Sequence, residues 1–244
     1  MHKLNSPVSG LPLQSLSMAI DVYWASGCPF SWRVLLALEH KGLPYNSHKL
    51  QLSLQAQKSP QMLAMNPRGR VPVVKHDDYV VFESLAVLYY LDLKYPSPPI
   101  FGRSAEEAAV IVRVIEEFQA YTEAHILGIC RSLLADEIFP EGGPPLGPEA
   151  LTEAMHGVAR EARTIEQRLA RSDWIVGEDY SACDMMIFPM IQLLRRALLQ
   201  PRGADLARRF LPVEVHYPAL GRWLDRIESQ PGYVQTYPPH WRNG

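Results

Sequence analysis

The chain has 244 residues, of which 47% are hydrophobic and 20% are charged, and its formal net charge is −2. This composition is typical of a folded globular protein, and the length allows one large domain or two smaller ones. Because basic and acidic residues are interspersed, no strong positive field is expected to attract nucleic acid. Charges interrupt the apolar runs well before the roughly 20 residues that a membrane helix needs, so no membrane partner is expected.

Residues 1–17 contain Pro and Gly but no continuous apolar segment, so they are a poor signal peptide and are expected to form a flexible extension. The cysteines are Cys28, Cys130 and Cys183. They are too few and too scattered for a disulfide framework, and no C-x-x-C metal pair is present. We therefore expect a cytoplasmic protein that binds no metal.

Short strand-like and helix-like runs alternate up to about Tyr95. Strands are expected at 19–24, 44–50, 70–76 and 79–82, and helices at 29–42, 53–66 and 84–95. With right-handed crossovers, this βαβαββα order predicts a four-stranded mixed sheet with helices on both faces. Residues 18–95 thus have the outline of a thioredoxin-like domain.

The proline-rich segment 96–103 is expected to be an interdomain linker. Beyond it the strand pattern disappears. Helices are expected at 104–139, 149–171, 181–199 and 216–232, with a break at 140–148 and a surface tail at 238–244. Residues 104–244 therefore predict an all-α bundle, and the whole chain an α+β protein of two domains.

The stretch "SGCPFSWR", residues 26–33, places Cys28 between the first strand and the first helix. Pro29 suits the first helical position, so Cys28 is expected at the N-cap, facing free N–H groups. Those donors and the helix dipole would lower its pKa below the roughly 8.5 of a free thiol and make it a nucleophile. The alternative is a small buried apolar residue, which is the expected role of Cys130 and Cys183.

The stretch "NPRGRVPVV", residues 66–74, places Pro72 inside a strand-like run. A cis Val71–Pro72 bond would explain this and would leave the Val71 backbone able to pair with an extended peptide. An ordinary trans proline on an edge strand is the alternative.

In "FESLAVLYYL", residues 82–91, Ser84 is expected to be the N-cap of the following helix. A helix terminus of this kind can bind a carboxylate, while Glu83 can pair with an ammonium group. The two residues together suit the head group of an α-amino acid.

Taken in order, Cys28, Val71–Pro72 and Glu83–Ser84 resemble the cytosolic glutathione transferases over roughly residues 18–235. The resemblance implies glutathione as co-substrate, a small electrophilic or disulfide second substrate, and a homodimer. The residues that it implies for glutathione binding are Cys28, Pro29, Phe30, Lys58, Val71, Pro72, Glu83 and Ser84. Lys58 matches a lysine that faces the glycyl end of glutathione in the omega class, with an exposed helix lysine as the alternative.

The segment "CPFSWRVLLALEHKGLPY" is similar to the omega class, which favours thiol transfer, whereas "SWRV" within it resembles the zeta class. Arg33, common to both, is expected to pair with a Glu or a carbonyl group. Tyr23, Ser26 and Ser31 are weaker rivals of Cys28 for the sulfur-facing role, and packing is the expected role of Tyr23. In "GEDYSACDMMIFP", Ser181 and Asp184 resemble the capping box of the family's helical domain, a structural feature.

Cys28 is expected to carry thiol transfer, reduction or conjugation that depends on glutathione. Ser31 stands where a dithiol enzyme has its second cysteine, so a thiol from outside the chain must complete any disulfide exchange. A substrate pocket is expected between the domains, with Phe30, Phe118, Tyr121 and His125 as candidates or as ordinary core residues. The alternatives are a zeta-like isomerase or dehalogenase and a non-catalytic interaction module.

Overall fold

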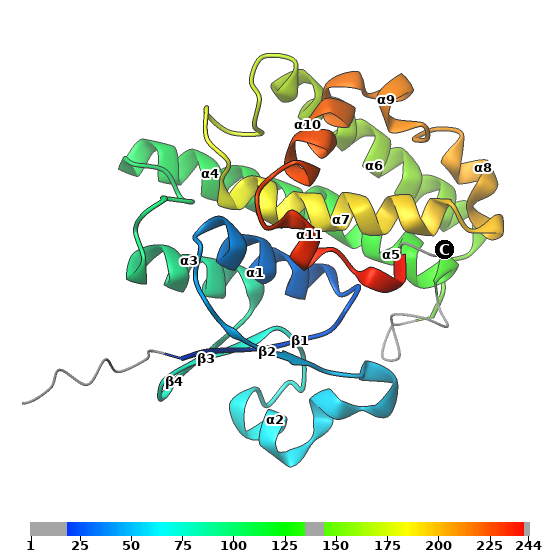
Figure 1. Cartoon of the computed structure of the whole chain (residues 1–244). Helices are drawn as coiled ribbons and strands as arrows, with labels where there is room; N and C mark the ends of the chain where they lie inside the picture. Colours follow the sequence, from blue (N-terminus) through cyan, green and yellow to red (C-terminus); the bar gives the residue numbers. More distant parts are fainter. Residues whose placement is uncertain (1–18, 135–143, 242–244) are drawn as a thin grey trace, which may run out of the picture.

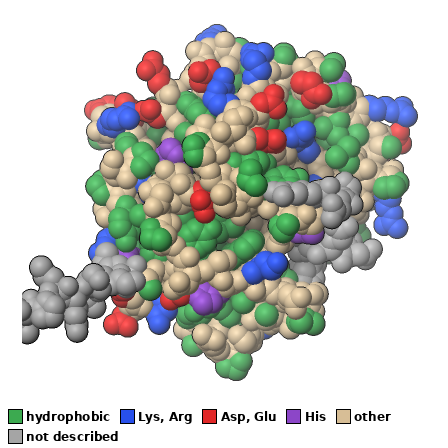
Figure 2. Space-filling view, in the orientation of Figure 1, with side chains coloured by type: hydrophobic (Ala, Val, Ile, Leu, Met, Phe, Trp, Pro, Cys, Tyr) green, Lys and Arg blue, Asp and Glu red, His purple; other side chains and the backbone are tan. Residues whose placement is uncertain are grey.

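The structure is a computed structural model that describes residues 19–134 and 144–241 (Figure 1). The predicted extension at 1–17 and the first part of the predicted break at 140–148 lie outside the described residues. Over the described ranges, no helix has the length and apolar character needed to cross a bilayer. Basic and acidic side chains are interspersed on the face shown in Figure 2.

A four-stranded sheet organises the first half of the chain. Its strands are β1 (Ile20–Trp24), β2 (Asn46–Lys49), β3 (Val73–His76) and β4 (Tyr79–Phe82). The order in the sheet is β2-β1-β3-β4, with β1 parallel to β2 and β3 antiparallel to both β1 and β4. This mixed sheet confirms the thioredoxin-like fold predicted from the order of elements.

Helices cover both faces of the sheet, as predicted (Figure 1). They are α1 (Pro29–His40), α2 (Pro60–Met65) and α3 (Ser84–Lys94). Helices α1 and α3 lie between the sheet and the helical half, and α2 lies on the opposite face. The expected helix at 53–66 is wrong in its first part, where two 3₁₀ turns precede α2. Pro60 begins α2 because Ser59 caps it by accepting a hydrogen bond from the Met62 N–H at 3.4 Å.

The second half contains only helices in its described part, which confirms the predicted bundle. They are α4 (Ala105–Phe118), α5 (Ala124–Leu133), α6 (Pro148–Leu169), α7 (Ala182–Leu198), α8 (Ala204–Ala207), α9 (Val213–His216), α10 (Pro218–Glu228) and α11 (Tyr233–Thr236). The long helix expected from residue 104 is interrupted by a π-helical turn, Gln119–Glu123, between α4 and α5. Such single turns often occur at functional sites.

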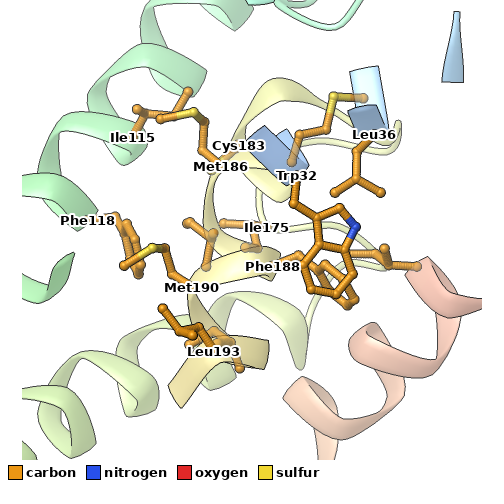
Figure 3. Close-up of a cluster of buried hydrophobic side chains, with 14 of the residues drawn as sticks. Trp32, Leu36, Ile115, Phe118, Ile175, Cys183, Met186, Phe188, Met190 and Leu193 are labelled. Carbon is orange, nitrogen blue, oxygen red and sulfur yellow. The ribbon is translucent and has the colours of Figure 1, made fainter. Parts of the chain in front are cut away.

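Helix α7 runs through the centre of the bundle and is buried along nearly its whole length. Trp32 of α1 packs edge-on against Phe188 of α7, with ring centroids 5.4 Å apart. Figure 3 shows Cys183 among the same core side chains. Burying large apolar side chains such as these contributes about 2–3 kcal/mol each, so the contact between α1 and α7 joins the two halves firmly.

The C-terminal residues depart from the expected surface tail. Residues 239–241 form a 3₁₀ turn, η5 (Pro239–Trp241), and Trp241 is only 8% exposed. Its ring packs edge-on against Trp32 at 5.6 Å. The prediction of a surface tail is wrong here because it relied on the proline-rich composition. The large apolar side chain of Trp241 packs against α1 instead. Residues 242–244 lie outside the described residues.

Candidate functional site

Three of the predicted motifs meet at one edge of the sheet. Tyr23 at the end of β1 pairs with Val73 at the start of β3, and Val73 pairs in turn with Phe82 at the end of β4. Because β3 runs antiparallel to both neighbours, the chain that leaves β1, the chain that enters β3 and the chain that leaves β4 all lie at this edge. These connections carry Cys28, Val71–Pro72 and Glu83–Ser84.

A tight turn places Cys28 at the start of α1. The Cys28 N–H donates to the Ala25 carbonyl at 3.2 Å, which closes a four-residue turn. Gly27 has a φ of +80°, as the third residue of a type II turn requires. Pro29 then begins α1, and Cys28 is its N-cap, as the sequence predicts.

Cys28 is a free cysteine that is half-buried as a residue, and its side chain makes no capping hydrogen bond. Burial raises the pKa of this thiol above its ordinary value. The N–H and hydroxyl groups of Ser31, the N–H of Phe30 and the charge of Arg33 lower the pKa, but by less. The expected depressed pKa is therefore wrong for the ligand-free chain, because burying a sulfur anion costs more than the helix terminus returns.

Arg33 is buried in α1 and joins three elements. Its Nε donates to the Met186 carbonyl of α7 at 3.0 Å, and its Nη1 donates to the Ser84 hydroxyl at 3.3 Å. Its Nη2 pairs with Glu123 of the π-helical turn at 2.5 Å. The guanidinium also lies 4.8 Å from the centre of the Phe30 ring. Arg33 was expected to pair with a Glu or a carbonyl group, and it pairs with both.

Burial lowers the pKa of Arg33, and the Glu123 carboxylate opposes that shift. A cation that is removed from water needs such a partner, because an uncompensated buried charge is strongly destabilising. The Arg33–Glu123 pair therefore links the first half of the chain to the bundle through a contact that neither half contains alone.

Glu83 and Ser84 begin α3 in an unusual backbone conformation. Glu83 is the N-cap residue, with a φ of +69°, and its side chain is exposed and makes no capping bond. A non-glycine residue in this region stores strain, which structures retain mainly at functional sites. The expectation of Ser84 as the N-cap is wrong. Ser84 is instead the first helical residue, and its buried hydroxyl accepts the hydrogen bond from Arg33.

The Val71–Pro72 peptide bond is cis, as its position in a strand-like run suggested. Val71 is partly exposed and precedes β3. Within residues 19–134 and 144–241, no other backbone group forms a hydrogen bond with Val71. Its N–H and C=O groups thus lack a backbone partner among these residues, and an extended peptide could supply one.

Lys58 is the last residue of a 3₁₀ turn, Ala56–Lys58, that precedes α2. Its Nζ donates to the Arg68 carbonyl at 3.4 Å. A Cβ atom on Gly69 would lie only 2.6 Å from the Lys58 Cδ, so the lysine stem packs directly over that glycine. The ammonium group therefore lies beside the turn at Arg68 and Gly69 that precedes Val71 in the chain.

The four aromatic candidates for a substrate pocket have different surroundings. Phe118 is buried in the bundle core, among the side chains that include Met190 (Figure 3), so its pocket role is wrong. Tyr121 is 61% exposed. The His125 ring lies over Gly157 of α6, where a Cβ atom would approach it to 2.7 Å. Phe30 stays near Arg33 at the start of α1.

The rivals of Cys28 have other partners. Tyr23 stacks on His48 of β2 with ring centroids 4.6 Å apart, which agrees with a packing role. The Ser31 hydroxyl is buried and accepts from the Ala25 N–H at 3.3 Å. The Ser26 hydroxyl lies 3.1 Å from the Nδ1 of His240.

The capping box at the start of α7 is present. The Ser181 hydroxyl caps the helix, and both the N–H and the hydroxyl of Ser181 donate to Asp184 Oδ2 at 3.0 Å. The other oxygen, Oδ1, accepts from the Ile175 N–H at 3.1 Å and from the Trp223 indole at 2.7 Å. Burial raises the pKa of Asp184, although these hydrogen bonds lower it. This residue supports the bundle and lies away from the sheet edge.

Sequence reasoning missed three contributors to the region around Cys28. Glu123 lies in a stretch that looks like continuous helix, so nothing in the local pattern marks it as the partner of Arg33. His240 and Trp241 lie in a tail that looks like surface chain. The one available signal was the presence of tryptophan in that tail. Among the described residues, no three His, Cys, Asp or Glu side chains lie together as metal ligands would.

Comparison with protein families gives two matches. The model described as "Glutathione S-transferase, N-terminal domain" matches residues 27–94, and the model described as "Glutathione S-transferase, C-terminal domain" matches residues 131–231. The first range contains all three motifs at the sheet edge, and the second contains the α7 capping box.

Individual proteins resemble the chain over most of its length. Glutathione S-transferase A of Pleuronectes platessa is 28% identical and covers 91% of this chain and 92% of its own. Maleylacetoacetate isomerase of Pseudomonas aeruginosa is 26% identical and covers 85% of this chain and 91% of its own. The crystal structure of a glutathione S-transferase from the Antarctic clam Laternula elliptica is 26% identical, with a TM-score of 0.72, over 93% of this chain and 95% of the other.

Proposed function

The chain belongs to the glutathione S-transferase family, and from that premise we propose that it is an enzyme that binds glutathione at the sheet edge and uses Cys28 for thiol transfer. One observation carries the proposal. Cys28 is the N-cap residue of α1 but makes no capping hydrogen bond, and it lies at the same edge of the sheet as Val71–Pro72 and Glu83–Ser84. These groups complement an extended peptide that carries a thiol and charged ends.

In the proposed complex, glutathione lies across the sheet edge as a short added strand. The Val71 backbone pairs with the cysteinyl part, which brings the glutathione sulfur to Cys28, with Pro29 and Phe30 beside it. The exposed Glu83 carboxylate binds the ammonium of the γ-glutamyl end, and the N–H groups at the start of α3, next to Ser84, bind its carboxylate. Lys58 binds the glycyl carboxylate.

The proposed reaction is a disulfide exchange in two steps. Cys28 loses its proton, and the thiolate attacks the glutathione sulfur of a glutathionylated substrate. The bond between Cys28 and glutathione forms as the substrate disulfide breaks, and the substrate leaves as a thiolate that takes up a proton. A second glutathione thiolate attacks the mixed disulfide, which releases oxidised glutathione and restores Cys28. Ser31 stands where a second enzyme cysteine would be needed, so the second thiol comes from glutathione.

A second candidate is an isomerase or dehalogenase in which glutathione keeps the reactive thiolate and Cys28 stays protonated. Two observations favour it. The raised pKa of Cys28 preserves its S–H group as a hydrogen-bond donor, and the chain is similar to the maleylacetoacetate isomerase of Pseudomonas aeruginosa. The first candidate corresponds to the omega-like part of the Cys28 motif and the second to its zeta-like part.

We also propose that the protein acts in the cytoplasm as a homodimer. Large apolar side chains stand exposed on α3, where Tyr89 is 52% and Leu93 is 69% accessible, and on α4, where Val110 is 38% accessible. A second copy of the chain would remove them from water. Light scattering is expected to give twice the chain mass, and Leu93→Glu to give the single mass. A wild-type protein that stays at the single mass would contradict the dimer.

Incubation with oxidised glutathione, followed by intact mass measurement, tests the catalytic proposal. The wild-type chain is expected to gain one glutathionyl group, and Cys28→Ser to gain none. Cys130→Ala is the matched control, because that cysteine is fully buried and should leave the adduct unchanged. Calorimetric titration of the wild type and of Cys28→Ser with reduced glutathione separates the alternatives. Wild-type binding without an adduct supports the second candidate, and neither binding nor adduct supports a non-catalytic module.

A further inference from the structure

The C-terminal turn η5 lies against the turn that presents Cys28. Ser26 and Gly27 are the two central residues of that turn. The Ser26 hydroxyl lies 3.1 Å from His240 Nδ1, across 214 positions of sequence. A Cβ atom on Gly27 would lie 3.2 Å from the His240 ring and 3.2 Å from the Trp241 indole nitrogen. The two rings of η5 therefore fill the space beside the turn.

Contacts with α1 fix η5 in this place. Trp241 is buried and packs edge-on against Trp32, with ring centroids 5.6 Å apart. The Trp32 indole donates to the Thr236 hydroxyl of α11 at 2.8 Å. Figure 1 shows this last segment, in red, beside the start of α1. The turn before Cys28 is thus held between its own helix and the far end of the chain.

We propose that His240 is a positioning residue for Cys28. Through its contact with Ser26 and its ring packing on Gly27, it holds the turn so that the sulfur stays close to the donors at the start of α1. The inference rests on the proposed function only in taking Cys28 as the reacting group. Displacing a nucleophile by about 1 Å can cost roughly 100-fold in rate, so a small loosening of this turn is measurable.

The charged groups around the sulfur affect the apparent pKa that the pH profile of Cys28 reactivity would give. Arg33 on α1 is the charge that acts on the Cys28 pKa, and Glu123 of the π-helical turn partly neutralises Arg33. His240 approaches from η5. The N–H groups of Phe30 and Ser31 lower the thiol pKa only while the sulfur lies near them. If His240 holds the turn, its loss moves the apparent pKa of Cys28 upward.

His240 is itself exposed, so replacing it opens no core cavity. His240→Ala removes both contacts with the turn. His240→Asn keeps a polar nitrogen close to the position of Nδ1 and should retain the bond to Ser26. Ser26→Ala removes the same bond from the other side. Gln235→Ala, at an exposed position of α11 in the same C-terminal segment, is the matched control.

The measurement is the rate at which iodoacetamide alkylates Cys28, followed by the mass of its peptide between about pH 7 and pH 10. We expect His240→Ala to lower the rate at pH 8 about tenfold and to move the profile to higher pH, with an unchanged thermal midpoint. His240→Asn should stay within about threefold of wild type, and Gln235→Ala should match it. Ser26→Ala should resemble His240→Ala, and the double variant should be no slower than either single one.

A His240→Ala rate within about twofold of wild type would overturn the proposal, as would a His240→Asn variant no faster than His240→Ala. Alkylation requires no glutathione, so it separates this inference from the proposed function. If the wild type gains no adduct from oxidised glutathione, thiol transfer is wrong while the alkylation series still decides the role of His240. If the adduct forms but the His240 variants alkylate normally, only the positioning role is wrong.

Discussion

Helices α1 and α7 begin with opposite chemistry. At the start of α7, the fully buried Asp184 accepts four hydrogen bonds, and the Ser181 hydroxyl caps the helix. At the start of α1, the partly exposed Cys28 makes no capping bond. Every helix leaves N–H groups without partners at its N-terminus. At α7 a side chain of the protein accepts a hydrogen bond from these N–H groups, whereas at α1 they remain available to a ligand.

The comparison of the two helix N-termini shows that the same local structure can contribute to stability at α7 and to ligand binding at α1. The α7 terminus is inside the bundle, where an unsatisfied donor would cost about 1–3 kcal/mol. The α1 terminus lies at the edge of the sheet, where a ligand or water can supply the missing acceptor. Substitutions at the two termini should therefore separate stability from reactivity.

The largest effect is expected from Asp184→Ala. It leaves four donors without their acceptor in a buried site, and the free energy of unfolding should fall by about 4 kcal/mol. Urea unfolding at fixed protein concentration measures this. Asp184→Asn, which keeps the shape and part of the accepting capacity, should lose clearly less. A loss below about 1 kcal/mol for the alanine variant would contradict the contrast between the two termini.

Arg33→Met should have the next largest effect. It removes the partner of Glu123 inside the contact between the halves, and we expect a loss of about 3 kcal/mol in the same unfolding assay. The double variant Arg33→Met/Glu123→Gln is the control, because removing both charges avoids an uncompensated one. It should recover more than half of the loss. A double variant no more stable than the single one would show that the ion pair is not the cause.

The pH dependence of Cys28 reactivity comes third. Burial raises the pKa of the Cys28 thiol, and below the pKa each unit of pH raises the thiolate population about tenfold. The iodoacetamide rate should therefore keep rising beyond about pH 8.5. Free glutathione measured in parallel provides the reference thiol. A plateau at neutral pH would mean that the helix terminus outweighs burial after all.

The smallest effect on stability is expected from Cys28→Ser. The cysteine contributes no cap, whereas serine is a favoured N-cap, so the variant should be unchanged or more stable by up to about 1 kcal/mol. It makes the start of α1 resemble the start of α7 while removing the sulfur. The same unfolding assay measures it, with Cys130→Ala as a core cysteine for comparison. Destabilisation by more than about 1 kcal/mol would show that Cys28 has a structural role.

Local rules explain which features the sequence could predict. Pro29 marks the start of α1, Pro72 within a strand-like run indicated the cis bond, and the spacing of Ser181 and Asp184 predicted their reciprocal cap. Each of these depends on residues a few positions apart. The order of strands and helices likewise sufficed for the mixed sheet and the bundle.

Long-range packing explains what the sequence could not predict. Arg33 finds Glu123 at a separation of 90 residues, and Ser26 meets His240 at a separation of 214. The direction of the Cys28 pKa depends on how deeply the folded chain buries the sulfur, which no motif encodes. Phe118 faces the core rather than a pocket for the same reason, since helical spacing alone does not say which neighbour a face meets.

The Arg33 contacts also limit how this protein can be divided or recombined. Its guanidinium pairs with a carboxylate and donates a hydrogen bond to a carbonyl group, both in the helical half. Its positive charge also lowers the pKa of the Cys28 thiol in the first half. A first half expressed alone, or fused to a foreign bundle without an equivalent of Glu123, would place a cation at its surface and change the environment of Cys28. The chemistry of the cysteine is therefore a property of the joined halves, and modular exchange of either one must preserve that pair.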